Sequence, residues 1–197
     1  MTLLLFKVGH MKHQNHQRSI RRFAGKAPKI SETVFVDESA VVIGDVCIGQ
    51  DSSIWPLALL RGDMNSITVG ERSSIQDGSI CHITHAGPYN PEGYALRIGD
   101  DCTIAHSVTL HGCAIGDRVL IGMGSIVMDG AEIADDVVIG ANSLVPPGKK
   151  LASGFLYLGS PAKKIRPLNA EEMAYFTYSS ANYVKLKNQY LADDEKA

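Results

Sequence analysis

Aliphatic residues recur at every sixth position through most of the chain. The positions are Val36, Val42, Ile48, Ile54 and Leu60, then Val69, Ile75 and Cys81, then Ile98, Ile104 and Leu110, and finally Ile115, Ile121, Val127, Ile133, Ile139 and Val145. A period of six fits neither a helix, with a period of roughly 3.6, nor an isolated strand, with a period of about 2. It fits a triangular coil of three short strands per turn, in which the inward aliphatic residues of successive turns stack.

Small residues accompany these aliphatic positions. Gly, Ala or Asp usually follows directly, and Ser, Ala or Cys is often found four positions later. Such residues suit a chain that rounds a tight corner between short strands. We therefore predict an all-β parallel solenoid over residues 31–166, which resembles the left-handed parallel β-helices built from hexapeptide repeats. The left hand comes from this resemblance, because general crossover rules favour the right hand.

The two ends of the chain carry different patterns. Residues 1–30 are basic and aperiodic, so we expect an irregular N-terminal extension, with Met11 as an alternative start. Residues 158–162 resemble one more hexad. Residues 167–197 follow it, and Asn169 and Glu172 are spaced as a capping box. Apolar residues at near-helical spacing then predict an amphipathic helix over 170–192 that packs on the outside of the β-helix. They are Met173, Phe176, Ala181, Val184 and Leu191.

Composition narrows the classes of function. The formal net charge is -2, with 19 Lys plus Arg against 21 Asp plus Glu, and this balance offers no basic surface for nucleic acid. The apolar run over residues 3–6 is too short for a membrane span or a signal-peptide core, and the four cysteines lack CxxC spacing. We therefore expect a cytoplasmic protein with reduced cysteines. His10, His13 and His16 lie in the polar N-terminal segment, where we expect adventitious metal affinity at most.

Large side chains at some corner positions break the rule of the repeat. They are Trp55, Arg61, Gln76, His82, His111 and Met128. If residues 84–96 loop outward, the count of hexads places Leu60, Cys81 and Leu110 on one face. Arg61, His82 and His111 then form a column with the strand spacing of about 4.8 Å. By the same count Ile75 and Ile104 share another face, which stacks Asp77 against His106 and places Gln76 beside them.

This column predicts a metal site that one chain cannot complete. Two imidazoles one coil apart can converge on one ion, at about 2.0–2.1 Å from each nitrogen. His106 starts from a different side of the triangle, so a second molecule must supply it, and a threefold assembly brings the required faces together. Three histidines with an open fourth position are typical of catalytic zinc. Neutral imidazole also suits Fe²⁺ and Co²⁺.

Several motifs on the hexads resemble those of one enzyme family. They are Arg61-Gly62-Asp63, Gln76-Asp77-Gly78, His82, and His106 and His111 five residues apart. In this order they resemble the gamma-class carbonic anhydrases, in particular the compact bacterial subgroup that includes YrdA, CaiE and PaaY-like proteins. The resemblance covers residues from about 28 to 190, including the Gly-Ser-Pro-Ala stretch and the terminal helix.

The resemblance implies a ligand set and a reaction. His82, His106 and His111 would hold Zn²⁺ in a homotrimer, with His106 supplied by the adjacent subunit. A hydroxide on the metal would attack CO2 to give bicarbonate. Gln76 would hydrogen-bond this nucleophile, and Tyr183 would approach from the terminal helix. Arg61, Asp63 and Asp77 would form a charged network that orients the site.

Two positions depart from the pattern of the family. The best-studied members carry glutamates, linked to proton transfer, where this chain has Met64 and His85. His85 is either a substitute proton carrier or a solvated side chain. This departure keeps two alternatives open: a non-catalytic, metal-stabilised trimeric scaffold, and a hexapeptide acyltransferase in which one histidine acts as general base.

Overall fold

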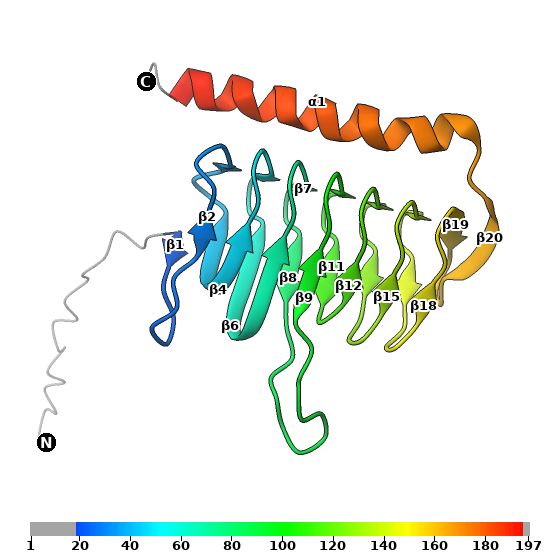
Figure 1. Ribbon diagram of the computed structural model, residues 1–197, viewed down its shortest axis with the longest axis horizontal. Coiled ribbons are helices and arrows are strands. Elements are labelled where there is room, and N and C mark those ends of the chain that lie inside the picture. The colour runs from blue at the N-terminus through cyan, green and yellow to red at the C-terminus, as the bar shows by residue number, and fades with distance from the viewer. Residues whose placement is uncertain (1–18, 195–197) are drawn as a thin grey trace, which may run out of the picture.

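The computed structural model describes residues 19–194 as a left-handed parallel β-helix followed by a single helix (Figure 1). Its strands line three faces, which we number by the order in which the chain visits them. Face 1 contains β1 (Ile20–Arg21), the first parts of β4 (Val41–Ile48) and β6 (Leu59–Val69), β8 (Ile80–His82), β11 (Thr109–His111), β14 (Ile126–Val127) and β17 (Leu144–Val145).

The other two faces complete each coil. Face 2 contains β2 (Lys29–Ile30), the second parts of β4 and β6, β9 (Leu96–Ile98), β12 (Ala114–Ile115), β15 (Glu132–Ile133) and β18 (Lys150–Leu151). Face 3 contains β3 (Phe35–Val36), β5 (Ser53–Ile54), β7 (Ser74–Ile75), β10 (Thr103–Ile104), β13 (Leu120–Ile121), β16 (Val138–Ile139) and β19 (Phe155–Leu158), and β20 (Lys163–Pro167) pairs with β19.

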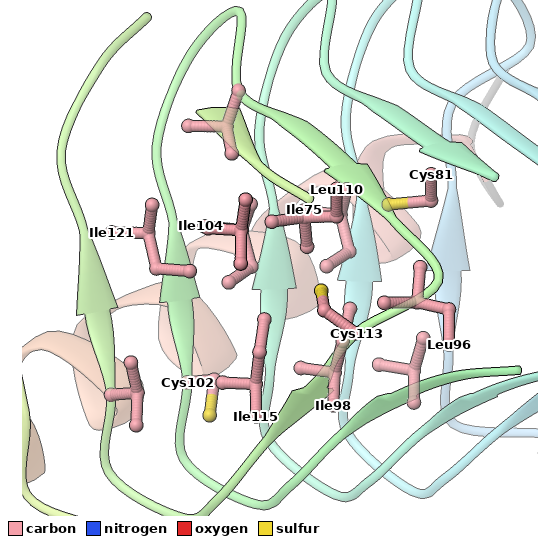
Figure 2. Close-up of a cluster of buried hydrophobic side chains, with 14 of the residues drawn as sticks. Ile75, Cys81, Leu96, Ile98, Cys102, Ile104, Leu110, Cys113, Ile115 and Ile121 are labelled. Carbon is pink, nitrogen blue, oxygen red and sulfur yellow. The ribbon is translucent and has the colours of Figure 1, made fainter. Parts of the chain in front are cut away.

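The core consists of the aliphatic residues that mark the repeat. All of the positions from Val42 to Val145 are buried, whereas Val36, in the first coil, is only partly covered. In the parallel register Ile75 pairs with Ile104, and Ile98 pairs with Ile115, so that like positions stack from coil to coil (Figure 2). This stacking confirms the solenoid predicted from the period of six.

The N-terminal and C-terminal edges of the solenoid differ from expectation. Residues 20–30, assigned to the irregular extension, contribute β1 and β2, which pair with β4. Ile30 of β2 pairs with Ile48 and packs against the core, six positions before Val36. Residues 158–162, predicted to resemble one more hexad, continue the stack against β17. The Leu144 amide donates to the Gly159 carbonyl at 2.9 Å, the Ala162 amide donates to the Leu144 carbonyl at 2.7 Å, and Ala162 is buried. On either side of this segment, β19 and β20 form an antiparallel pair, in which Tyr157 takes the place of an aliphatic residue above Ile139. Reversal of the chain direction ends the stack at this point.

Helix α1 (Ala170–Asp194) returns along face 3 from the last coil to the first (Figure 1). The predicted capping box is present: the Glu172 amide donates to Oδ1 of Asn169 at 2.8 Å, and the Asn169 amide donates to Oε2 of Glu172 at 2.9 Å. The buried side of the helix is partly polar. Met173 and Ala181, expected to face the coil, are exposed.

Polar contacts hold this helix against face 3. Buried Ser179 hydrogen-bonds Thr103 at 2.8 Å, and Lys187, only 1% exposed, lies 3.0 Å from Oδ1 of Asp51. Phe176 is buried as predicted, and Val184 and Leu191 are partly buried. The apolar spacing therefore predicted part of the contact side but not its buried serines and lysine. No helix in residues 19–194 is long and apolar enough to cross a bilayer.

Candidate metal and catalytic site

Strands β8 and β11 place His82 and His111 side by side at the end of face 1. The register pairs the two residues directly, with Cys81 beside Leu110 in the core. Nδ1 of His82 lies 3.0 Å from Nε2 of His111, and the ring centroids are 5.0 Å apart. The two imidazoles, which the count of hexads placed in one column, therefore face each other, and each turns one ring nitrogen toward the other.

The second ring nitrogen of His82 is held by Asp63. Nε2 lies 3.2 Å from Oδ1 of Asp63, and Arg61 donates to the other oxygen of that carboxylate. Burial would raise the pKa of Asp63, but the hydrogen bonds from Arg61 and His82 outweigh it, so the pKa lies below its usual value. Burial, assisted by the Arg61 charge, lowers the pKa of His82 despite Asp63, which favours the neutral imidazole that metals bind.

The second ring nitrogen of His111 is held by Asp129, a residue that the sequence reasoning missed. Nδ1 of His111 lies 2.9 Å from Oδ1 of Asp129. The same oxygen accepts a hydrogen bond from the Thr84 hydroxyl at 2.8 Å. The repeat does predict its place. Val127 stacks on Leu110 in the core, so Asp129, two residues after Val127, lies one coil beyond His111 at the same corner.

His106 lies at a different corner, between faces 3 and 1. Strands β7 and β10 stack it against Asp77, and Nδ1 of His106 lies 2.8 Å from Oδ2 of that carboxylate. Both side chains are about half exposed, at 49% and 50%. Within the described part of a single chain, no group of three or more His, Cys, Asp or Glu side chains could hold a metal ion.

Gln76 lies beside Asp77 and is 97% buried, although it sits at the edge of the solenoid. Tyr183 of α1 hydrogen-bonds the Gln76 side chain. Burial raises the pKa of the Tyr183 hydroxyl above its usual value, so Tyr183 is uncharged near pH 7. The Tyr183 ring also contacts Trp55 edge-on, at 6.0 Å between centroids. The aromatic residues of the helix and of face 3 thus enclose the Gln76 amide.

Two positions where the family carries glutamate are solvent-facing. Met64 is 51% exposed at the bend of β6. His85 is exposed in the outward hairpin that joins β8 to β9, and it makes no hydrogen bond to another described residue. Figure 1 shows this hairpin projecting from the solenoid. Neither side chain is therefore held in place by burial.

The donor set fits a divalent metal of the zinc type. Each of the three histidines uses one nitrogen toward a carboxylate, and these pairs are His82 with Asp63, His106 with Asp77, and His111 with Asp129. A carboxylate on the second nitrogen is the usual arrangement for a metal-ligating histidine, because it fixes the tautomer and the ring orientation. With protons directed at Asp63 and Asp129, two unshared electron pairs meet between His82 and His111, where a cation is needed.

Comparisons with known proteins agree with the repeat and the motifs. The family described as Bacterial transferase hexapeptide (six repeats) matches residues 112–147. Protein YrdA of Escherichia coli is 55% identical over 172 residues, which cover 87% of this chain and 94% of that protein. Gamma carbonic anhydrase 3, mitochondrial, of Arabidopsis thaliana is 43% identical over 190 residues, which cover 95% of this chain and 72% of that protein.

Solved structures share the architecture. The crystal structure of a hexapeptide transferase family protein from Anaplasma phagocytophilum matches with a TM-score of 0.79 and 41% identity, covering 86% of this chain and 96% of that one. The Anaplasma protein is named as a transferase, whereas the relatives similar in sequence include carbonic anhydrases. Sequence identity over nearly the whole chain, including the histidine-bearing coils, shows that the protein belongs to the gamma carbonic anhydrase-like family of hexapeptide-repeat proteins.

Proposed function

We propose that this protein is a homotrimeric metalloprotein that hydrates CO2 reversibly to bicarbonate. The metal, which we propose to be Zn²⁺ with Fe²⁺ and Co²⁺ as alternatives, would be held by His82 and His111 of one subunit and His106 of the next. One observation carries the proposal: all three imidazoles turn one nitrogen to a carboxylate and leave the other free for an ion.

Two exposed apolar surfaces support the trimer. The outward positions of face 1 are Val41, Leu59, Ile80, Thr109, Ile126 and Leu144. Ile80 and Ile126, which are 44% and 42% exposed, belong to the strands that pair with β11. The second surface flanks His106, where Met123 is 56% and Leu57 is 71% exposed. Contact between these surfaces in a closed ring of three would cover both and join His106 to the pair of imidazoles.

The outward residues of the remaining faces suit other roles. On face 2 they are largely polar and include Thr68, Arg97, Glu132 and Lys150, and face 3 is covered by α1. Face 1 is therefore the best candidate for contact with a second copy. All four cysteines are free, which supports a reducing compartment, and we propose the cytoplasm.

The residues around the site supply positioning and proton transfer. A bound divalent metal would lower the pKa of water to about 7, which makes hydroxide available at neutral pH. The Gln76 amide would orient the nucleophilic oxygen toward the carbon of CO2, with Tyr183 fixing the amide. Asp63, Asp77 and Asp129 would fix the tautomer and the orientation of the three imidazoles. The proton that water loses would pass to buffer, or through His85 in the outward hairpin.

A second candidate is a metal-stabilised trimeric scaffold without catalysis. The observation in its favour is that Met64 and His85, at the positions of the family's glutamates, are exposed to solvent and offer no carboxylate for proton transfer. Acyl transfer is a third candidate, supported by the name of the Anaplasma relative. Acyl-CoA turnover that persists after metal removal would favour it over CO2 hydration.

Complementation between variants tests whether the site is shared. His82→Ala and His106→Ala are each expected to lose bound metal and CO2 hydration. Random mixed trimers of the two variants should restore about a quarter of the wild-type sites, because each mixed trimer regains one complete site of three. Elemental analysis and stopped-flow CO2 hydration give the two readouts.

The outcomes separate the candidates. Restored metal together with restored hydration supports the proposed enzyme. Restored metal without hydration, in wild type as well as in mixed trimers, supports the scaffold. No restoration of metal in mixed trimers, with a metal-loaded wild type, would refute a site shared between subunits.

A further inference from the structure

Asp129 joins a proposed metal ligand to the outward hairpin. Its Oδ1 accepts from the Thr84 hydroxyl at 2.8 Å and lies 2.9 Å from Nδ1 of His111. The Asp129 side chain is 30% exposed and the His111 side chain 37% exposed, so both hydrogen bonds are partly shielded from water. One oxygen of Asp129 thus contacts both Thr84, 45 positions earlier in the chain, and His111, 18 positions earlier.

The hairpin holds Thr84 firmly in place. Thr84 and Tyr94 pair through two backbone hydrogen bonds of 2.9 Å. Asn65 donates to the Thr84 carbonyl at 3.2 Å, which ties the base of the hairpin to β6. Because the backbone is fixed from both sides, the Thr84 hydroxyl is a well-positioned donor to Asp129.

Glycines beside His111 and Asp129 allow the hairpin to approach this closely. Gly112 follows His111 and Gly130 follows Asp129. A Cβ atom on Gly112 would lie 2.6 Å from Cβ of Tyr94, and one on Gly130 would lie 2.9 Å from Cε1 of its ring. Tyr94 therefore packs over two residues without side chains, directly beside the His111–Asp129 hydrogen bond.

We infer that Asp129 is a positioning residue for the metal site, which places the proton of His111 on Nδ1 and directs Nε2 toward the ion, and that Thr84 fixes Asp129. This inference rests on the proposed function for the identity of the site. Only the Nδ1–H tautomer can donate to Asp129 while Nε2 keeps its unshared pair toward His82. Without the carboxylate, the neutral ring is free to protonate Nε2, and that tautomer cannot bind a metal through Nε2.

Nitrogen NMR of the trimer with ¹⁵N-labelled histidine tests the tautomer without relying on activity. The measurement uses metal-free protein at about pH 8, above the ordinary pKa of histidine of about 6.5. Wild type and Asp129→Asn, which retains an acceptor oxygen, should show His111 as the Nδ1–H tautomer. Asp129→Ala should shift it toward Nε2–H. Glu132→Gln is the matched control, since it removes a carboxylate three residues away that pairs with Lys150 at 2.8 Å.

Zinc affinity, measured by competition with a chromophoric chelator, is the second readout. Asp129→Ala should weaken binding by about 10-fold to 100-fold, as for other partners of metal-ligating histidines, with Asp129→Asn in between and Glu132→Gln unchanged. Thr84→Val should bind zinc several-fold more weakly than Thr84→Ser. If Asp129→Ala does not fold, the comparison of Thr84→Val with Thr84→Ser still tests the role of Asp129.

Two results would overturn the inference. One is an unchanged Nδ1–H tautomer of His111 in Asp129→Ala, and the other is zinc affinity equal in Asp129→Ala and Glu132→Gln. Zinc-loaded wild type that fails to hydrate CO2 would instead refute the proposed enzyme, and would leave the role of Asp129 standing.

Discussion

Nδ1 of His82 lies 3.0 Å from Nε2 of His111, although the two residues are 29 positions apart in the chain. Two nitrogens that share a tetrahedral metal at about 2.0–2.1 Å would lie roughly 3.3 Å apart. The pair is therefore close to its metal-bound separation within one subunit. Parallel strand pairing sets this distance, and the aspartates behind each ring set the direction of the free nitrogens.

Replacement of Gln76 separates catalysis from metal binding. Gln76→Leu keeps the volume but removes the amide proposed to orient the nucleophile. We expect bound zinc to stay at the wild-type level, while CO2 hydration falls by a factor on the order of 100, as when a preorganised hydrogen-bond donor is lost. Gln50→Leu, at an exposed corner, is the control. Loss of metal in Gln76→Leu would contradict the assignment.

A charge on the outward side of face 1 should break the trimer. Ile126→Lys places an ammonium group in the apolar row that flanks His111, and burying an unpaired charge at an interface is costly. We expect sedimentation to show monomers that have lost their metal. Thr68→Lys, on the polar outward side of face 2, should leave trimer and metal intact. A trimeric Ile126→Lys protein would show that the contact lies elsewhere.

The spacing of six also determines how much of the architecture can be predicted from the sequence. The spacing of six predicts the solenoid and the neighbours Arg61, His82 and His111, because identical coils convert position in the chain directly into position in space. It predicts the stacking of His106 on Asp77 for the same reason.

Other features could not be predicted because no periodic pattern carries them. Strand β1 pairs with β4 although its aliphatic residue, Ile20, is 41% exposed, so no buried residue marks this strand in the sequence. The buried side of α1 depends on Ser179 and Lys187 finding specific partners, Thr103 and Asp51. The hydrogen bond from Thr84 to Asp129 depends on where the outward hairpin places Thr84, which the count of hexads does not contain.

Gly112 should tolerate alanine poorly. Both Gly112 and Gly148 have positive φ, at +53° and +65°, so a Cβ atom costs roughly 1–2 kcal/mol at each. At Gly148 the Cβ meets open space, whereas at Gly112 it lies 2.6 Å from Cβ of Tyr94. We expect Gly112→Ala to lower the free energy of unfolding by about 1–3 kcal/mol more than Gly148→Ala.

Urea denaturation at matched protein concentration measures that difference. Gly112→Ala should also weaken zinc binding, since the added atom crowds the Asp129 carboxylate beside His111. Equal stability of the two variants would show that the hairpin moves away from Gly112 without cost.

The first turn of α1 should lose its ion pair only in strong acid. Hydrogen bonds from the Arg166 side chain, and then from the Asn169 amide, lower the pKa of Glu172 from 4.5 to about 2. Because the pKa is lower in the folded state, the stabilising contribution is complete above about pH 4.5 and is lost as the pH falls toward about 2.

Carboxyl ¹³C NMR of Glu172 during an acid titration measures this pKa. Arg166→Gln should move it back toward 4.5, because the first of the two causes is removed. Lys163→Gln removes an exposed cation from the same strand and should have no comparable effect. An unchanged Glu172 pKa in Arg166→Gln would assign the shift to the helix cap.

The return path of α1 has a consequence for how the protein unfolds. A stack of repeats, in which each coil contacts only its neighbours, can fray from either end independently. Here α1 starts after the final coil, and its Lys187 reaches Asp51 near the first coil. Unfolding of the final coils would therefore also remove the helix that contacts the first coils. Local opening at one terminus is thereby coupled to the other, and we expect the solenoid to melt as a single cooperative unit.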